Sequence, residues 1–308
     1  MIKIKNLFVQ DIRFPTSKDL TGSDAIHTDP DYSATYVTIT TNDPNLKGYG
    51  IAFTIGKGND IVAKCIEQYF YLFEGIDVDE LEKKIGKLWF DCVDHSQLRW
   101  LGPEKGVVHM AVAAIFNAAW DLIAKKHNKP LWKLISDYST DQIINLLTFK
   151  GVEDVLDKND AYKILNDNFK FREQRIKLLK EEGYPSYTTA AGWLGYSNDK
   201  IVELCKEYIL KGWKHFKIKV GNDLEADVKR LKLIRETIGN DCYIMVDANQ
   251  QWSVDQAIKH INAYKEFDLL FVEEPISPDD ILGFKKIKEA VGQVNLATGE
   301  ACSGRIMF

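Results

Sequence analysis

A pair of lysines is followed by three acidic residues at nearly regular intervals in the second half of this 308-residue chain. They are Lys217, Lys219, Asp247, Glu273 and Glu300, and they lie at or near the ends of short apolar runs. The successive intervals after Lys219 are 28, 26 and 27 residues. A strand, a turn, a helix of about a dozen residues and a second turn fill such an interval, so the spacing predicts repeated βα units.

The three acidic residues are of a type that binds hard cations. The carboxyl ends of parallel strands meet at one mouth of a (β/α) barrel, where active sites are built. Carboxylates converging there, without a pair of Cys or His residues beside them, suit Mg²⁺. We therefore expect Asp247, Glu273 and Glu300 to be metal ligands.

The two lysines are of a type that can remove a proton. Lys217 and Lys219 are two residues apart, so in a strand both point to the same face. A neighbouring ammonium and a nearby dication both disfavour a protonated amine, which makes a lysine a base near neutral pH. A Lys-x-Lys alone is more typical of a solvated strand edge, and a Glu-Glu-Pro of a turn. Their order and spacing at strand ends favour the chemical interpretation.

The segments between the apolar runs carry helix-start signals. Ser253 and Gln256 have the spacing of a capping box in front of apolar residues at helical intervals. Ser277 and Pro278 are a cap and a first-turn proline at the predicted start of the next helix. The unbroken apolar runs themselves are typical of parallel strands that are buried beneath helices.

Four motifs resemble the enolase superfamily: Lys-Ile-Lys-Val-Gly at 217–221, Val-Asp-Ala-Asn-Gln at 246–250, Val-Glu-Glu-Pro at 272–275 and Ala-Thr-Gly-Glu at 297–300. Members of that superfamily use a Lys or His base with one or two Mg²⁺ ions. The resemblance implies an α+β capping domain followed by a TIM-type (β/α) barrel, with Mg²⁺ as cofactor. It also implies that Lys219 takes the proton, that Lys217 contacts the substrate, and that Glu273 rather than Glu274 is the ligand.

Within the superfamily, the chain resembles most the L-fuconate dehydratase group, which includes a vertebrate mitochondrial relative. The segments that carry this likeness are 22–33, 97–109, 193–196 and 277–283. The resemblance implies that the N-terminal domain caps the barrel mouth and that its loop contacts substrate. The implied substrate-binding residues are Gly22, Ser23, Asp24, Tyr32, Lys217, Asn249 and Glu300.

The implied activity is that of a carbon–oxygen lyase in carbohydrate catabolism, converting L-fuconate to 2-keto-3-deoxy-L-fuconate and water. Lys219 would remove the hydrogen at C2, and the 3-hydroxyl would leave as water with help from an acid. Two alternatives stay open. One is another acid-sugar dehydratase or racemase of the superfamily, and the other is a non-catalytic fragment or binding protein of the same family.

The N-terminal part predicts a sheet followed by helices. We expect strands at 2–13, 35–41 and 47–54, and helices at about 58–75, 78–95 and 106–126. A polar loop at 21–32 includes His27, which is more typical of a surface residue than of a substrate contact. We assign 1–139 to the capping domain and 140–308 to a partial barrel. The barrel part would include a helical insert at about 151–183 and a first strand at 184–190.

Composition limits the partners and the compartment. The net charge is −5 and there is no Lys/Arg-rich run, so we expect no nucleic-acid partner. The five cysteines are widely spaced and suggest reduced thiols rather than disulfides or a zinc site. We expect no membrane partner, a small-molecule sugar acid as ligand, and a cytoplasmic location with a mitochondrial one left open. A homo-oligomer is compatible with the sequence.

The resemblance implies more barrel than the 308 residues contain. The sequence ends just after the fifth expected strand, at Ile306-Met307-Phe308. The family carries three further strands, with an Asp, the His of an acid–base pair and another acidic residue. The segment 301–305 also departs from the usual family pattern. We therefore expect a C-terminally truncated member with about five barrel strands, and an open edge where the barrel would close.

Overall fold

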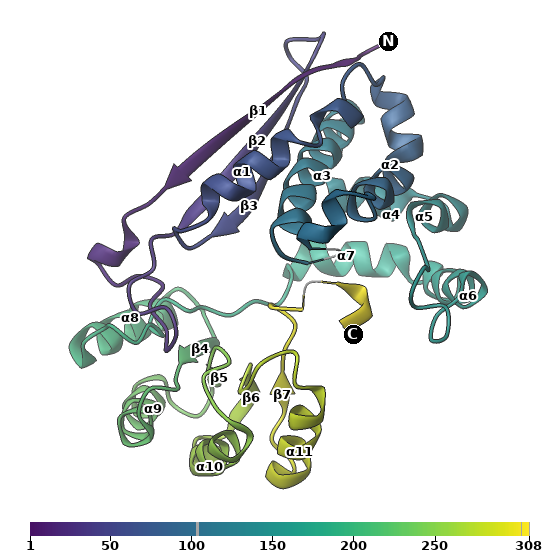
Figure 1. The fold of residues 1–308 in the computed structure, drawn as a ribbon. Helices are drawn as coiled ribbons and strands as arrows, with labels where there is room; N and C mark the ends of the chain where they lie inside the picture. The colour runs from purple at the N-terminus through teal and green to yellow at the C-terminus, as the bar shows by residue number, and fades with distance from the viewer. Residues whose placement is uncertain (103–104, 303, 308) are drawn as a thin grey trace. The chain divides into compact units, whose positions relative to one another are not determined.

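The computed structural model describes residues 1–102, 105–302 and 304–307, so parts of the 97–109 and 301–305 segments lie outside the described residues. Contacts divide the chain into two compact units. The first consists of Met1–Phe14, Tyr32–Gly183 and the described part of Ser303–Phe308. The second consists of Pro15–Asp31 and Tyr184–Cys302. Figure 1 shows the elements of each unit.

The first unit is a small sheet followed by helices. Its elements are β1 (Ile4–Arg13), β2 (Ser33–Thr41), β3 (Lys47–Thr54), α1 (Asn59–Glu67), α2 (Val78–Val93), α3 (Gly106–Lys126), α4 (Leu131–Asp137), α5 (Thr140–Leu146), α6 (Lys158–Phe169) and α7 (Arg172–Glu182). The three strands are antiparallel in the order β1-β2-β3. The three expected strands and the first three expected helices are thus present, with α1 shorter than expected because a 3-10 turn at Phe70–Leu72 follows it.

The sheet of the first unit packs closely on α3. A Cβ added at Gly50 of β3 would lie 2.1 Å from the carbonyl oxygen of Ala114, so only glycine permits this approach. Ala111, Ala114 and Ala118 are fully buried on the helix. Small residues on both elements let backbone meet backbone, which brings strand and helix together in one apolar core.

Helix α3 is also long and apolar enough, by length and composition, to cross a bilayer. Most of this helix is buried inside the protein. A single mostly buried helix is weak evidence for a membrane span, because the core helix of a globular protein has the same composition. Here the packing against β3 accounts for its apolar character.

Residues 140–183, which the sequence assigns to the barrel domain, belong to the first unit. The Thr140 hydroxyl donates to Asn166 at 2.6 Å, which joins α5 to α6. Arg172 at the start of α7 donates to the carbonyl oxygen of Ser136 at 3.2 Å. The expected helical insert therefore consists of two helices, α6 and α7, that bond to the elements preceding them.

The second unit is built of βα repeats. Its elements are α8 (Asn198–Leu210), β4 (His215–Lys219), α9 (Leu224–Ile238), β5 (Tyr243–Asp247), α10 (Val254–Tyr264), β6 (Leu269–Glu273), α11 (Ile281–Val291) and β7 (Leu296–Ala297). The four strands are parallel in the order β4-β5-β6-β7, with one βα unit between each pair (Figure 1). This confirms the repeat that the spacing predicts.

Two details of the repeat differ from expectation. The segment 184–190 is not a strand: it makes a single bridge, between Thr188 and Phe216. Pro185 has no N–H to donate, which weakens pairing there. The described part of the chain therefore has four barrel-type strands rather than five. Helix α11 begins after Asp280, whose side chain accepts from the Gly283 N–H, and not at Ser277. The capping box at Ser253 and Gln256 is confirmed.

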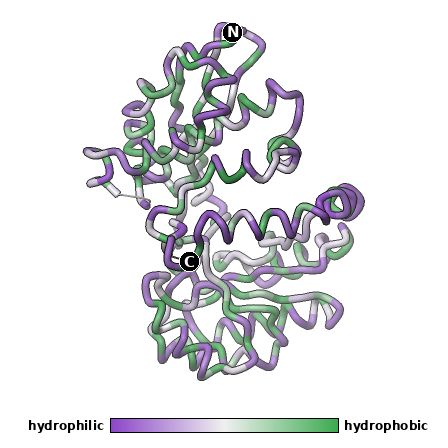
Figure 2. The backbone as a smooth tube through the Cα atoms, turned by 90° about the vertical axis from the view of Figure 1, so that its right-hand side faces the viewer, coloured by the Kyte–Doolittle hydropathy of each residue, from purple (hydrophilic) through white to green (hydrophobic). Residues whose placement is uncertain are grey.

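The sheet of the second unit has an apolar face and a charged face. Phe216, Ile218, Ile244, Val246 and Val272 are buried in one core with residues of α9, α10 and α11. In Figure 1 these three helices lie on the same side of the strands, and Figure 2 shows apolar and polar residues alternating along the helices. Strand alternation then places the intervening residues, including both lysines, on the opposite face.

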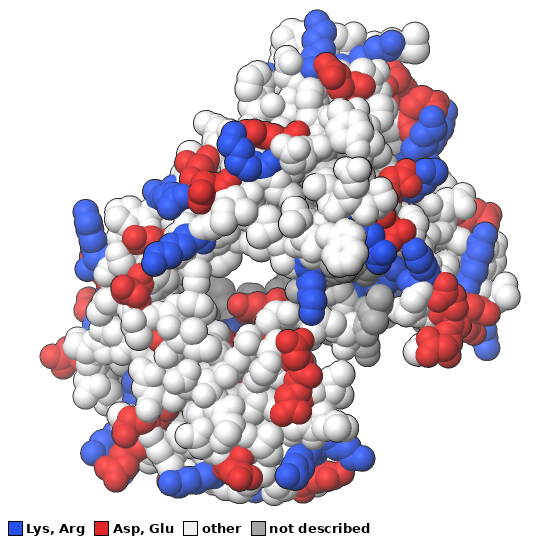
Figure 3. Space-filling model, in the orientation of Figure 1, with Lys and Arg blue, Asp and Glu red and all other residues white. Residues whose placement is uncertain are grey.

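The surface carries charges of both signs. On the face drawn in Figure 3, basic and acidic side chains are interspersed over the described residues rather than gathered by sign. Many form ion pairs one helical turn apart, such as Lys211 with Glu207 at 2.5 Å. Such exposed pairs contribute little to stability.

Candidate active site

Three of the five residues singled out from the sequence lie in one row across the parallel sheet. Lys219 is the register partner of Asp247, and Asp247 is the register partner of Glu273. Each is the last residue of its strand. The predicted convergence of charged residues at the carboxyl ends of β4, β5 and β6 is thus present.

Both lysines reach the same carboxylate. Lys219 Nζ lies 2.6 Å from Oδ2 of Asp247, and Lys217 Nζ lies 3.3 Å from the same oxygen. Lys217 Nζ also lies 2.8 Å from Oε2 of Glu273. Asp247 is fully buried, and the lysines are 4% and 7% exposed. A buried ammonium therefore lies between two strand-end carboxylates.

The neighbouring carboxylates of Asp247 and Glu273 keep Lys217 protonated in this arrangement. Burial by itself lowers the pKa of Lys217, because an ammonium loses solvation. The hydrogen bond to Glu273 and the charges of Asp247 and Glu273 outweigh burial, so its pKa lies above the ordinary value. Aromatic rings also face the amines: Lys217 Nζ is 4.8 Å from the Tyr187 ring centroid, and Lys219 Nζ is 5.8 Å from that of Trp193.

Asn249 connects the lysine and the carboxylate. Its Oδ1 accepts from Lys219 Nζ at 2.8 Å, while its backbone N–H donates to Oδ1 of Asp247 at 3.0 Å. Its φ is +46°, in the left-handed region that a non-glycine residue rarely adopts. Gln250 and Glu274 have φ of +67° and +42°. Strained backbone of this kind is common at functional sites.

Glu274 joins the turns that follow three strands. Its side chain accepts from Gln250 Nε2 at 3.2 Å and from the Ala301 N–H at 3.3 Å. Burial raises the pKa of this carboxyl, with the charges of Asp247 and Glu300 adding to the effect. Glu274 is 2% exposed, so the second Glu of the pair is the more buried one.

Glu300 does not lie in the row. The register partner of Glu273 in β7 is Ala297, and Glu300 follows three residues later in an exposed turn. In the part of the chain that the structure describes, no group of three or more His, Cys, Asp or Glu residues is arranged to hold a metal ion. The donor chemistry nevertheless fits a hard cation, because the oxygens of Asp247 and Glu273 already have a cation, the Lys217 ammonium, between them.

The N-terminal loop contributes three of its four named residues to the second unit. Gly22, Ser23 and Asp24 are buried there, whereas Tyr32 belongs to the first unit, with its ring 5.1 Å from that of Phe53. The Ser23 hydroxyl donates to the Leu20 carbonyl at 2.7 Å and accepts from the Gly195 N–H at 3.0 Å.

The Asp24 side chain forms its hydrogen bonds within its own loop. Its carboxylate accepts from the N–H groups of Ile26 and His27 and lies 3.0 Å from Nδ1 of His27. Ala25 lies beside the turn after β4, because a Cβ added at Gly221 would be 3.2 Å from the Ala25 Cβ. The loop therefore lies at the carboxyl end of β4.

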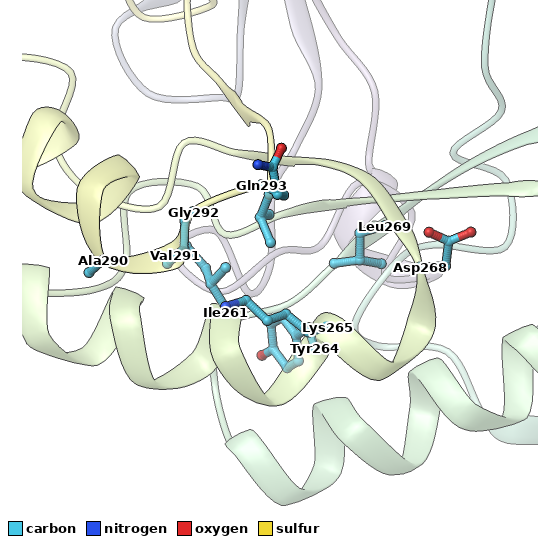
Figure 4. Close-up of a pocket in the computed structure, with 10 residues that line it drawn as sticks. Ile261, Tyr264, Lys265, Asp268, Leu269, Ala290, Val291, Gly292 and Gln293 are labelled. Atoms are coloured by element: carbon cyan, nitrogen blue, oxygen red, sulfur yellow. The ribbon is translucent and has the colours of Figure 1, made fainter.

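A hollow of about 510 Å³ lies at the other end of the strands. Figure 4 shows it between α10 and α11, lined by Lys265, Asp268, Leu269 and Gln293 among others. Asp268 and Leu269 mark the start of β6, whereas Glu273 marks its end. This hollow therefore belongs to the amino end of the sheet and not to the charged row.

Sequence comparison assigns both parts of the chain to known domain families. Residues 23–136 match the N-terminal domain of mandelate racemase and muconate lactonizing enzyme, and residues 200–308 match the enolase C-terminal domain-like family. The crystal structure of human mitochondrial enolase superfamily member 1 is 42% identical, covers 99% of this chain and 70% of its own, and superposes with a TM-score of 0.96.

The chain belongs to the enolase superfamily. Among superfamily relatives, the L-galactonate dehydratase of Hypocrea jecorina is 43% identical over 97% of this chain and 67% of its own length. A racemase from Streptomyces coelicolor A3(2), solved with bound magnesium, is 26% identical with a TM-score of 0.72, covering 97% of this chain and 69% of its own. The expected capping domain and TIM-barrel-type domain are those of the superfamily.

Sequence reasoning missed several residues that shape the site. Tyr187 and Trp193 face the lysines, and Asp227 and Arg230 are buried on α9 behind β4. A signal for the last pair exists in the sequence. Asp227 occupies the same helical stripe as the apolar residues at 231, 234 and 238, where a charged side chain is out of place.

Proposed function

We propose that this protein is a Mg²⁺-dependent acid-sugar dehydratase, a carbon–oxygen lyase that converts an aldonate to a 2-keto-3-deoxy acid and water. The observation that carries the proposal is the row of Lys219, Asp247 and Glu273 at adjacent strand ends. A lysine beside buried carboxylates combines a base for a carbon acid with oxygen ligands for a hard cation. Relatives named L-galactonate dehydratase and L-talarate/galactarate dehydratase support the same reaction class.

Lys219 is the proposed base. In its neutral form Nζ accepts the hydrogen from C2 of the sugar acid, and the 3-hydroxyl then leaves as water after protonation. The resulting enol gains a proton at C3 as it relaxes to the 2-keto acid. Asn249 and Asp247 fix Nζ between two acceptors, at 2.8 and 2.6 Å, so the amine is oriented before substrate arrives.

Asp247, Glu273 and Glu300 are the proposed metal ligands. A bound Mg²⁺ would supply charge stabilisation for the substrate carboxylate as C2 loses its hydrogen. Asp247 and Glu273 are positioned by their register in the sheet. Glu300 lies outside that row, and what supports its inclusion is that the turn containing it is bonded to Glu274 through the Ala301 N–H. Lys217, beside both carboxylates, is a proposed substrate contact.

The proposed substrates share the L-galacto configuration. L-Fuconate is 6-deoxy-L-galactonate, so it differs from L-galactonate only in lacking the hydroxyl at C6. The reacting centres at C2 and C3 are the same in both acids, and a site built around them accepts either unless it contacts C6. Gly22, Ser23, Asp24, Tyr32, Asn249 and Glu300 are the proposed contacts to the sugar acid.

The test is a direct comparison of the two acids. The purified chain with Mg²⁺ is incubated in D₂O with L-fuconate, L-galactonate or the C3 epimer of one of them. Deuterium at C2 is followed by NMR and keto acid by semicarbazide trapping. We expect C2 exchange with the first two, because the chain contains the proposed base, and neither exchange nor keto acid with the epimer. Absence of both with every aldonate, although Mg²⁺ and aldonate bind, would favour the alternative of a non-catalytic binding protein.

Location and assembly are part of the same proposal. A small sugar acid is the expected partner, and neither nucleic acid nor membrane is invoked. Relatives are named mitochondrial, so a mitochondrial as well as a cytoplasmic location is compatible with the chemistry. Fractionation of cells that express the protein decides between them, and gel filtration with light scattering tests for a homo-oligomer.

A further inference from the structure

Two charged residues on α9 are buried behind the strand that carries the proposed base. Asp227 is 2% exposed and Arg230 is 9% exposed, one helical turn apart. Burying a charge costs free energy, and well-packed apolar residues in such positions are often at least as stable. The bonds that these two side chains make therefore indicate what they are for.

Asp227 holds the turn that follows β4. Its Oδ2 accepts from the Gly221 N–H at 2.8 Å and from the Tyr264 hydroxyl at 3.0 Å. Gly221 is two residues after Lys219 and has φ of +125°, which excludes most other residues. The carboxylate thus fixes the backbone on the C-terminal side of Lys219, while Tyr264 of α10 fixes the carboxylate.

Arg230 holds the segment beside β4. Its Nη1 donates to the Trp193 carbonyl at 3.1 Å, and both Nη atoms lie 3.5 Å from the Gly192 carbonyl. The same Gly192 carbonyl accepts from the backbone N–H of Lys219 at 2.9 Å. The guanidinium therefore orients the acceptor to which the main chain of Lys219 is bonded.

The same segment carries the ring that faces the lysine. The Trp193 ring centroid is 5.8 Å from Lys219 Nζ, and Arg230 bonds the carbonyl of that residue. A Cβ added at Gly192 would lie 2.2 Å from the Lys217 carbonyl oxygen, so this segment lies directly against β4. A shift of the segment would move both the backbone and the aromatic neighbour of Lys219.

We propose that Asp227 and Arg230 are positioning residues that fix Lys219 for proton abstraction, holding its backbone from both sides without touching substrate. The inference rests on the proposed function, because it takes Lys219 as the base. Proton transfer at carbon depends on placement within fractions of an ångström, and a misplacement of about 1 Å can cost about a hundredfold in rate.

Arg235 provides a matched control on the same helix. It also donates to backbone carbonyls, those of Gly239 and Cys242 at 2.9 and 2.6 Å and that of Phe267 at 2.8 Å. These lie before β5 and β6, at the amino end of the sheet. Replacing either arginine removes the same kind of bond, but only Arg230 bonds beside Lys219.

The first experiment compares Arg230→Met, Arg235→Met, Asp227→Leu and Asp227→Asn by C2 deuterium exchange in a bound aldonate. We expect Arg230→Met and Asp227→Leu to lower the exchange rate at saturating aldonate by about tenfold to a hundredfold, with the aldonate Kd within about twofold of the wild type. Asp227→Asn keeps an acceptor for the Gly221 N–H and should restore most of the rate. Arg235→Met should match the wild type once the folded fraction is corrected.

A second measurement separates this inference from the proposed function. Amide hydrogen exchange is followed by mass spectrometry over 189–195 and 217–222, and over 239–243 and 266–269. Arg230→Met should speed exchange in the first pair of segments, and Arg235→Met in the second. If the wild type exchanges C2 of no aldonate, the proposed function fails while this measurement still decides the positioning. The positioning inference would be overturned by equal losses of C2 exchange rate in Arg230→Met and Arg235→Met. Unchanged amide protection at 189–195 and 217–222 in Arg230→Met would also overturn it.

Discussion

Lys219 Nζ lies 2.6 Å from Oδ2 of Asp247, and the two residues are register partners at the ends of β4 and β5. The sheet itself thus sets the distance between them, because parallel pairing fixes which residues stand side by side. Asp247 has no exposed surface, so its charge depends on the lysines for compensation. This relationship makes the pair sensitive to single substitutions.

Lys219→Met should abolish C2 exchange of a bound aldonate. Methionine keeps the length and apolar stem of the side chain but has no basic nitrogen, and loss of a general base costs about a hundredfold or more. Deuterium incorporation at C2, followed by NMR, measures this. Lys214→Met is the matched control, since Lys214 is exposed just before β4. Exchange at the wild-type rate in Lys219→Met would assign the base elsewhere.

Asp247→Asn should weaken Mg²⁺ binding. An amide keeps the shape of the carboxylate but removes its charge, and even the loss of an outer hydrogen-bond partner of a metal ligand costs about tenfold in affinity. Isothermal titration with MgCl₂ measures the change. Asp241→Asn, at an exposed position before β5, controls for the general loss of one negative charge. Equal affinities in the two variants would remove Asp247 from the ligand set.

The sequence predicts the row at the strand ends well, and the reason is geometric. Each βα repeat returns the chain to the same edge of the sheet, so Lys219, Asp247 and Glu273 come into register. Glu300 follows Glu273 at a similar interval but falls outside the row. Strand β7 has two residues and ends at Ala297, which is the register partner of Glu273. An interval counts residues and does not reveal where a strand ends.

Features that depend on tertiary contacts were not predictable from the same patterns. The left-handed backbone at Glu274 has no signal in the sequence, whereas Asn249 is of a residue type that adopts this conformation more often than most. Asp227 is marked by its place in the apolar stripe of α9, but the bonds that it and Arg230 make beside β4 appear only once the helix is packed there. The bonds of α5–α7 to the preceding helices likewise depend on packing, which the composition of 140–183 does not encode.

Asp24→Asn should raise the KM for L-fuconate or change which sugar acid is preferred. The Asp24 carboxylate accepts three hydrogen bonds within its loop, including two from backbone N–H groups. An amide can keep only part of this pattern, so the loop at the carboxyl end of β4 should become less ordered. Steady-state kinetics with L-fuconate and L-galactonate measure the effect. Asp29→Asn, exposed in the same loop, should leave both KM values unchanged. The reverse ranking of the two variants would contradict the assignment of Asp24.

Tyr32→Phe, in the first unit, tests the fourth named residue in the same assay.

The cysteines should differ strongly in reactivity. Burial raises the pKa of Cys92 to about 12 and that of Cys205 to about 11, so little thiolate forms at either near neutral pH. Cys302 is partly exposed. Brief treatment of the native chain with iodoacetamide at pH 8, followed by peptide mass spectrometry, should modify Cys302 well before the other two. Urea should equalise the rates, and labelling of Cys92 at the native rate of Cys302 would contradict the packing of α2.

Asp137→Asn should destabilise the first unit at neutral pH but not in acid. Side-chain hydrogen bonds from Lys133 and Lys129 lower the pKa of Asp137 from 3.8 to about 2. Lys129 Nζ lies 2.9 Å from Oδ2, and Lys133 pairs with Oδ1. Because the folded chain binds this proton less readily than the unfolded chain, the stabilisation is fully present above the ordinary pKa. It is lost as the pH falls through about 2.

The measurement is the urea midpoint of wild type and Asp137→Asn between pH 7 and pH 2. We expect a constant difference from pH 7 down to about pH 4 and a shrinking one below it, as the wild-type carboxylate takes up its proton. High salt should reduce the difference at pH 7, since the pair is only partly shielded from solvent. Asp154→Asn, an exposed acid in the connection before α6, should show a smaller difference. A difference for Asp137→Asn that stays the same at pH 2 would mean that the effect comes from packing and not from the carboxylate charge.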